Sequence, residues 1–147
     1  VILATIDPGA IVGWALWDSS GELLSAGHKA FKSFQIPTTN DQRFAYRQEI
    51  NPSKARIELP DHFSVQTKDV IACAARAGYI RCMFDQSGAE TEYVEVGKWK
   101  GSVPKKITER RARERLRPVE LTRVLNDSSH CWDAIGIGLV FFGRGRR

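Results

Sequence analysis

The chain has 147 residues, 42% of them hydrophobic, and a formal net charge of +5 at pH 7. No apolar run reaches the roughly 20 residues of a membrane-spanning helix, so we expect one soluble domain over 1–147, in the cytoplasm and with no membrane partner. Its cysteines, Cys73, Cys82 and Cys131, lack the Cys-x-x-Cys spacing. They predict neither a disulfide framework nor a zinc knuckle, and we expect buried free thiols.

Apolar patterning and turn residues predict three strands at the start of the chain. The run Val1–Ile6 is almost continuously apolar and ends at Asp7-Pro8-Gly9, which is typical of a buried central strand followed by a turn. Strands over Gly13–Trp17 and Glu22–Ala30 flank a polar turn at 18–21. We therefore expect an antiparallel meander.

The rest of the chain mixes helices with strands. In order, we expect a short helix over Asp41–Ile50, a strand over Lys54–Leu59, a long helix over Gln66–Phe84, a strand over Thr91–Val96, helices over Ile107–Leu116 and Glu120–Leu125, and a last helix with Ser128 or Ser129 as N-cap.

The long helix carries two apolar stripes. The first contains Ile71, Ala74, Ala75, Gly78 and Cys82, and the second contains Val70, Cys73, Ala77, Ile80 and Phe84. One stripe can cover the sheet. The other is either core beneath a loop or the interface of a dimer.

Positive charge is concentrated in one block. Between Lys98 and Arg123 there are ten basic and three acidic residues, so the rest of the chain is slightly acidic. Pairs at i,i+4 such as Glu109 with Arg113 are typical of a solvated helix face, but they do not account for the excess. The block favours a polyanionic partner such as nucleic acid.

Three carboxyl groups stand inside or at the end of apolar elements: Asp7, Glu58 and Asp133. Each alone has an ordinary explanation, as a turn residue, an outward strand residue and a first-turn helix residue. His130 precedes Asp133 by three residues, so both share one helix face, and a neutral imidazole can bind a metal or accept a proton. Because clustered carboxylates stay ionised only around a cation, the set predicts Mg²⁺ or Mn²⁺ and, beside the basic block, phosphodiester hydrolysis.

Three motifs follow one another in an order that is typical of a known family. They are Ile6-Asp7-Pro8-Gly9 with Gly13, then Ile57-Glu58, then His130-Cys131-Trp132-Asp133-Ala134. With them, the sequence resembles the RuvC family of Holliday junction resolvases, including phage-type members, over nearly the whole chain. The resemblance implies an α/β, RNase H-like fold in which a mixed five-stranded sheet is flanked by helices. It also implies a catalytic and metal-binding set of Asp7, Glu58, His130 and Asp133.

What the resemblance implies for function is a crossover junction endodeoxyribonuclease of DNA recombination and repair, acting in a bacterial or phage-infected cell. It would resolve four-way DNA junctions by paired symmetric nicks, with two divalent ions, Mg²⁺ or Mn²⁺, at the scissile phosphate. His130 would be either a metal ligand or a group acting on the attacking water. A homodimer would place two active sites on the junction, and the second stripe of the long helix would then be its interface.

The resemblance also indicates DNA-binding residues, which are Lys100, Lys105, Lys106, Arg110 and Phe63. The basic residues would contact phosphates, whereas Phe63 either stacks on a base or belongs to the core. Trp99 allows the same two interpretations. Two other functions stay open, namely RNase H-type cleavage of RNA–DNA hybrids and binding of branched nucleic acid without catalysis. An actin-like ATPase is disfavoured because it needs two such domains.

Overall fold

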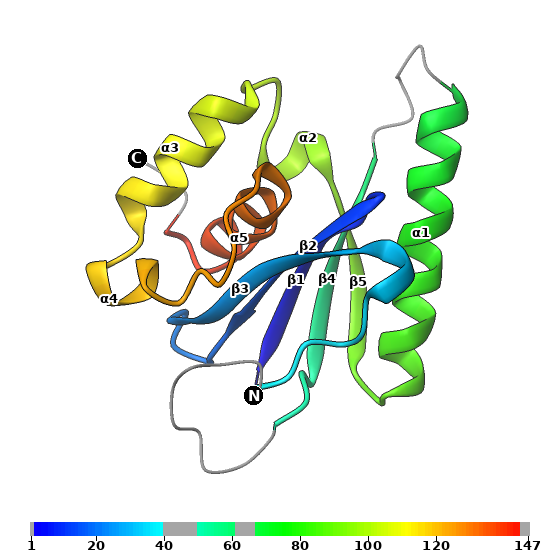
Figure 1. The fold of residues 1–147 in the computed structure, drawn as a ribbon, viewed down its shortest axis with the longest axis horizontal. Helices are drawn as coiled ribbons and strands as arrows, with labels where there is room; N and C mark the ends of the chain where they lie inside the picture. Colours follow the sequence, from blue (N-terminus) through cyan, green and yellow to red (C-terminus); the bar gives the residue numbers. More distant parts are fainter. Residues whose placement is uncertain (1, 40–49, 61–66, 145–147) are drawn as a thin grey trace.

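Five strands form one mixed sheet in the computed structural model of the chain, which describes residues 2–39, 50–60 and 67–144 (Figure 1). The strands are β1 (Leu3–Asp7), β2 (Ile11–Trp17), β3 (Leu23–Ala30), β4 (Lys54–Leu59) and β5 (Glu90–Glu95). The helices are α1 (Thr67–Gln86), α2 (Val96–Trp99), α3 (Lys105–Arg115), α4 (Pro118–Leu121) and α5 (Ser129–Phe141), with a short 3₁₀ helix η1 (Phe31–Ser33) after β3.

The order of the strands in the sheet is β3-β2-β1-β4-β5. The first three form the predicted antiparallel meander, whereas β4 runs parallel to β1 and β5 runs parallel to β4. The turn after β2 is stabilised by Asp18, whose carboxylate accepts hydrogen bonds from the amides of Ser20 and Glu22. Because β1 and β4 are parallel neighbours, their carboxyl ends lie side by side at one end of the sheet.

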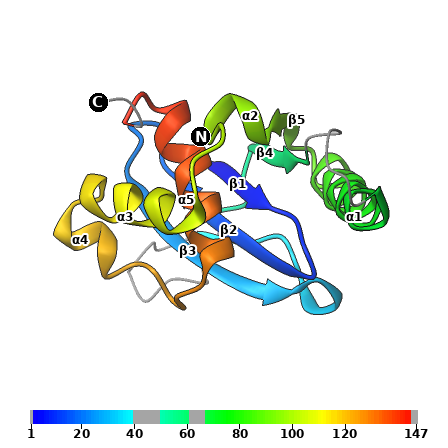
Figure 2. The same cartoon turned by 90° about the horizontal axis from the view of Figure 1, so that it is seen from above.

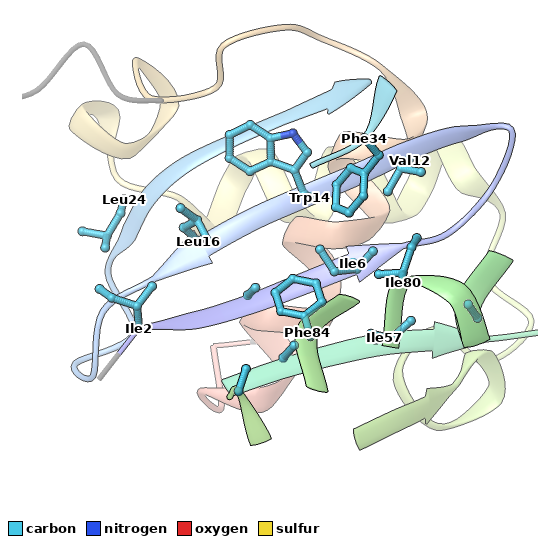
Figure 3. Close-up of a cluster of buried hydrophobic side chains, with 14 residues drawn as sticks. Ile2, Ile6, Val12, Trp14, Leu16, Leu24, Phe34, Ile57, Ile80 and Phe84 are labelled. Atoms are coloured by element: carbon cyan, nitrogen blue, oxygen red, sulfur yellow. The ribbon is translucent and has the colours of Figure 1, made fainter. Parts of the chain in front are cut away.

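Helices cover both faces of the sheet (Figures 1 and 2). α1 packs on one face beside β4 and β5, and α5, backed by α3, crosses β1 and β2 on the other face. Side chains alternate along β1, so Ala4 and Ile6 belong to the core beneath α1 and Leu3 belongs to the core beneath α5. Figure 3 shows the first of these cores, to which α1 contributes Ile80 and Phe84.

α5 is buried along most of its length, from Cys131 to Leu139. Its N-cap is Ser128, one of the two predicted residues, whose hydroxyl accepts a hydrogen bond from the first turn. Gly138 lets the helix lie close to the sheet, because a Cβ at this position would collide with the indole of Trp17. Thr5 of β1 donates a hydrogen bond to a carbonyl of the same helix at 2.8 Å. The position of α5 over β1 and β2 is therefore fixed by close packing.

The predicted strands and the long, basic and last helices are confirmed, with ends that shift by a residue or two. The helix predicted over Glu120–Leu125 is confirmed only at Glu120 and Leu121, because α4 ends there and the residues after it pair with the edge strand β3. There Ala26 accepts a hydrogen bond from the amide of Leu125 at 2.8 Å and donates one to the carbonyl of Arg123 at 3.1 Å. This pairing covers part of an edge that would otherwise be exposed. The helix predicted over Asp41–Ile50 falls, at 41–49, outside the described residues.

The expectation that the second stripe of α1 forms an interface is wrong. Ala77, Ile80 and Phe84 of that stripe are 0% exposed and pack against the sheet. The first stripe faces outward, where Ile71 is 62% exposed and Cys82 is also exposed. Both stripes are apolar, but only the larger side chains of the second fill the space above the sheet without leaving voids.

The three cysteines differ in how far their side chains are buried. The three cysteines are free, as predicted, but only Cys131 is buried, while Cys73 is half-buried and Cys82 is exposed.

Within the described part of the chain, no helix combines the length and the hydropathy that crossing a lipid bilayer requires.

A buried carboxylate, Glu120, ties the C-terminal segment to the body of the fold. It accepts hydrogen bonds at 2.8 Å from both terminal guanidinium nitrogens of Arg144 and from the backbone amides of Leu23 and Arg117. Arg144 also donates to the carbonyl of Gly21 at 2.7 Å. Burial alone would raise the pKa of Glu120, but the hydrogen bonds, led by that of Arg144, lower it to about 2.

We expect Glu120→Ala to lower the free energy of unfolding by about 3 kcal/mol, because it leaves the half-buried Arg144 without its carboxylate. Urea denaturation at neutral pH measures this loss. Glu114→Ala is the matched control, since the Glu114 side chain is 66% exposed and should cost almost nothing.

The same site predicts a dependence on pH. The pKa of Glu120 is below its usual 4.5, so its stabilising effect is complete above pH 4.5 and is lost as the pH falls toward 2. The stability of the wild type should therefore fall toward that of Glu120→Gln in this range. A difference that stays constant with pH would contradict the assignment.

Candidate active site

Two carboxyl groups lie next to each other at the carboxyl ends of β1 and β4. Ile6 pairs with Ile57 in the parallel ladder, so Asp7 and Glu58, the next residue of each strand, are neighbours. Strand alternation turns both side chains toward the face that α5 covers, the face on which Thr5 bonds that helix. Asp7 is buried and Glu58 is half-buried.

The first turn of α5 brings His130 to Asp7. Gly13 of β2 permits this approach, because a Cβ there would collide with the carbonyl oxygen of His130. Nδ1 of His130 lies 2.8 Å from Oδ2 of Asp7, and 31% of the imidazole side chain is exposed. The histidine is thus bound to a site carboxylate on one side and open to solvent on the other.

Asp133 lies one turn further along α5 and binds two lysines. Nζ of Lys100 is 2.9 Å from its Oδ1, and Nζ of Lys105 is 3.9 Å from its Oδ2. The Asp133 and Lys100 side chains are 6% and 11% exposed, whereas Lys105 is 59% exposed. Lys100 therefore belongs to the buried part of the site, and Lys105 lies at its rim.

Two carboxyl groups of the site, Glu58 and Asp133, have a raised pKa. Burial, followed by the charges of Asp7 and Asp133, raises the pKa of Glu58 to about 8. A hydrogen bond from the indole N–H of Trp99 to Oε2 of Glu58, at 2.8 Å, acts in the opposite direction, as does Lys100. Burial also raises the pKa of Asp133, which the hydrogen bond from Lys100 partly offsets. Asp7, Glu58 and Asp133 thus form one cluster, whose negative charge the buried Lys100 only partly balances.

The donor types in this cluster suit a hard divalent cation, because they are three carboxylates and one imidazole. Among the described residues, no group of three such side chains is arranged to share a metal ion, since each carboxylate is turned toward its own protein partner. The raised pKa of Glu58 nevertheless indicates that added positive charge would stabilise its ionised form. The set fits Mg²⁺ or Mn²⁺ in its chemistry, and its ligands would be Asp7, Glu58, His130 and Asp133.

The other predicted DNA-binding residues lie outside the cluster. Lys106 and Arg110 are exposed on α3, and Arg110 is 3.9 Å from Glu114. Phe63 lies outside the described residues.

Some contacts of the site are not evident in the sequence. Trp99, for which the sequence indicates only base stacking or core packing, also donates a hydrogen bond to Glu58. The thiol of Cys73 in α1 donates a hydrogen bond to the carbonyl of Pro8 at 2.9 Å, which ties α1 to the turn that follows Asp7. The one available signal was the pair Trp99-Lys100 soon after a strand, because these two residues each bind one carboxylate.

Comparison with known proteins identifies the fold. No model of a known protein family matches the chain, and no curated protein matches its sequence. The solved structure of T. thermophilus RuvC in complex with Holliday junction substrate is similar to it, with a TM-score of 0.61 and 16% sequence identity. The match covers 98% of this chain and 96% of that chain. The chain thus has the α/β, RNase H-like fold of RuvC that the sequence predicts.

Proposed function

We propose that the chain is a metal-dependent endonuclease that cleaves four-way DNA junctions by phosphodiester hydrolysis. The observation that carries this proposal is the cluster of Asp7, Glu58, His130 and Asp133 at the carboxyl ends of β1 and β4. It is supported by the likeness to a RuvC structure that contains a Holliday junction substrate. The basic helix α3, which packs on α5 beside the cluster, supports a nucleic acid as the partner.

The proposal gives each side chain of the cluster a role. Bound Mg²⁺ or Mn²⁺ would supply Lewis-acid stabilisation and an activated water. When Asp7 is ionised, its hydrogen bond with His130 places the imidazole proton on Nδ1, so Nε2 can accept a proton from water. Lys100 balances the charge of Asp133 in the free protein. Asp7 would therefore both bind the cation and fix the tautomer of His130.

The exposed lysines and arginines of α3 would bind the phosphates of branched DNA. Lys105, Lys106 and Arg110 are exposed on the first turns of this helix, and Nζ of Lys105 lies 3.9 Å from Oδ2 of Asp133 in the cluster. Contacts of this kind give affinity and little sequence specificity. They would hold a junction arm beside the reacting phosphate.

A homodimer is part of the same proposal. The outward side of α1 exposes large side chains that a second copy could cover, including Ile71 at 62% and Tyr79 at 61%. A second copy packed on this side would supply a second active site. Two sites related by a twofold axis match the twofold symmetry of a four-way junction.

The catalytic assignment predicts that Asp7→Asn abolishes junction cleavage, with a rate loss of more than about 100-fold, because it removes a cation ligand and the partner of His130. Junction binding, measured by gel shift, should change little. Asp85→Asn, an exposed carboxyl in the last turn of α1, is the matched control. Loss of binding together with cleavage would indicate a structural role for Asp7 and contradict the assignment.

The excess of negative charge at the site predicts a dependence of stability on pH. Because the pKa of Glu58 is raised from 4.5 to about 8, the folded protein binds this proton more tightly than the unfolded chain does. In EDTA, the wild type should therefore lose stability relative to Glu58→Gln as the pH rises from 4.5 to 8. Urea denaturation across this range measures the difference, and saturating Mn²⁺ should reduce the advantage of the variant. Parallel curves would contradict the charge cluster.

The DNA surface predicts that Lys105→Ala weakens junction binding and lowers the slope of log affinity against log salt by about 1, because one phosphate contact is lost. Fluorescence anisotropy at several salt concentrations gives both values. Lys54→Ala, at the opposite end of β4, should leave the slope unchanged. A slope that Lys105→Ala does not alter would count against a phosphate contact at this position.

A further inference from the structure

Trp99 at the end of α2 connects Glu58 with α5. Its indole N–H donates a hydrogen bond to Oε2 of Glu58 at 2.8 Å. Its ring packs against Gly136, where a Cβ would lie 2.5 Å from Cζ3 of the indole. The ring thus occupies a space beside α5 that a residue other than glycine would fill. From this position, just after β5, the indole reaches Glu58 on the neighbouring strand β4.

The fold contains the same arrangement a second time, two residues along α5. The indole of Trp17 packs against Gly138, and its N–H donates a hydrogen bond to Oγ1 of Thr5 at 2.9 Å. In both cases a helix glycine receives an indole whose N–H bonds a side-chain oxygen on the sheet. Only the acceptor differs, because Thr5 is a core residue and Glu58 is a carboxylate of the candidate site. The pair provides an internal control for the role of Trp99.

Glu58 needs such a partner more than the other carboxylates of the site do. Its side chain has three torsions, and the charges of Asp7 and Asp133 repel its ionised form. A hydrogen bond to Oε2 limits these torsions without using all the acceptor capacity of the carboxylate, which has two oxygens. Hydrogen bonds of this kind orient carboxylates that bind metal ions, and their removal typically weakens metal binding by about 10- to 100-fold.

We propose that Trp99 is a positioning residue, whose indole N–H holds the Glu58 carboxylate in the orientation that takes up the divalent cation. The inference rests on the proposed metal-dependent function and deepens it. Trp99 acts through Glu58 and touches neither the DNA nor the reacting atoms in this role. With this role, two consecutive residues each hold one carboxylate of the site, because Trp99 binds Glu58 and Lys100 binds Asp133.

The test compares Trp99→Phe with Trp17→Phe, since each variant keeps a ring and loses one indole hydrogen bond. Mn²⁺ affinity is measured by titration calorimetry on the DNA-free protein, after circular dichroism has established folding. We expect Trp99→Phe to bind Mn²⁺ about 10-fold more weakly than the wild type. It should also lower kcat for junction cleavage with little change in KM, because DNA affinity comes from other residues. Trp17→Phe should lose stability but keep its Mn²⁺ affinity.

A double-mutant cycle shows whether Trp99 acts through Glu58. In a Glu58→Gln background, Trp99→Phe should cause little further loss of Mn²⁺ affinity, because the carboxylate it positions is gone. Additive losses would contradict the inference. Gly136→Ala, with Gly138→Ala as its control, displaces the Trp99 ring without changing either partner of the bond and should weaken Mn²⁺ binding as well.

The outcomes separate this inference from the proposed function. Equal Mn²⁺ affinity in Trp99→Phe and Trp17→Phe, with metal-dependent cleavage intact, would overturn the role of Trp99 alone. A wild-type protein that binds no Mn²⁺ and cuts no junction would overturn both.

Discussion

Repulsion among three buried or half-buried carboxyl groups is the constraint on which the candidate site depends. Asp7, Glu58 and Asp133 come from β1, β4 and α5, so no local sequence feature relieves their mutual repulsion. Each is instead stabilised by partners that the tertiary fold supplies. Asp7 is paired with His130, Glu58 with Trp99, and Asp133 with Lys100 and, more distantly, Lys105. The opposing effects leave the pKa of Glu58 at about 8, which is a cost in stability that a bound cation would remove.

Small residues bring these groups together. Gly13 allows the first turn of α5 to approach β2 closely. Gly136 and Gly138 leave room for the rings of Trp99 and Trp17. Each glycine is a point of close approach, so the distances in the site are set by the packing of α5 against the sheet. The apolar character of α5 therefore serves function as well as stability. It holds His130 and Asp133 at fixed positions above two strands that end in carboxylates.

Much of the fold and of the candidate site could be predicted because the signals are local. Strand-ending Asp7 and the i,i+3 pair His130 and Asp133 are visible in short motifs, and period-2 and period-3.6 patterns locate most elements. The contacts that could not be predicted join distant residues. The indole of Trp99 reaches Glu58 while its ring packs against Gly136 of α5. The sequence around Glu120 is typical of a surface residue, and its burial becomes clear only from its hydrogen bonds with Arg144. Hydropathy could not predict which stripe of α1 covers the sheet. Both stripes are apolar, and hydropathy does not distinguish the larger side chains that fill this face from the smaller ones that do not.

Junction cleavage is best tested with a labelled four-way junction, incubated beside a linear duplex and an RNA–DNA hybrid in Mg²⁺, Mn²⁺ or EDTA. We expect paired nicks at symmetric positions of the junction alone, present with either metal and absent in EDTA. Tight binding of the junction without cleavage in either metal would contradict this expectation and leave a protein that recognises branched DNA without processing it. Cleavage of the hybrid in place of the junction would contradict it in favour of an RNase H-type activity.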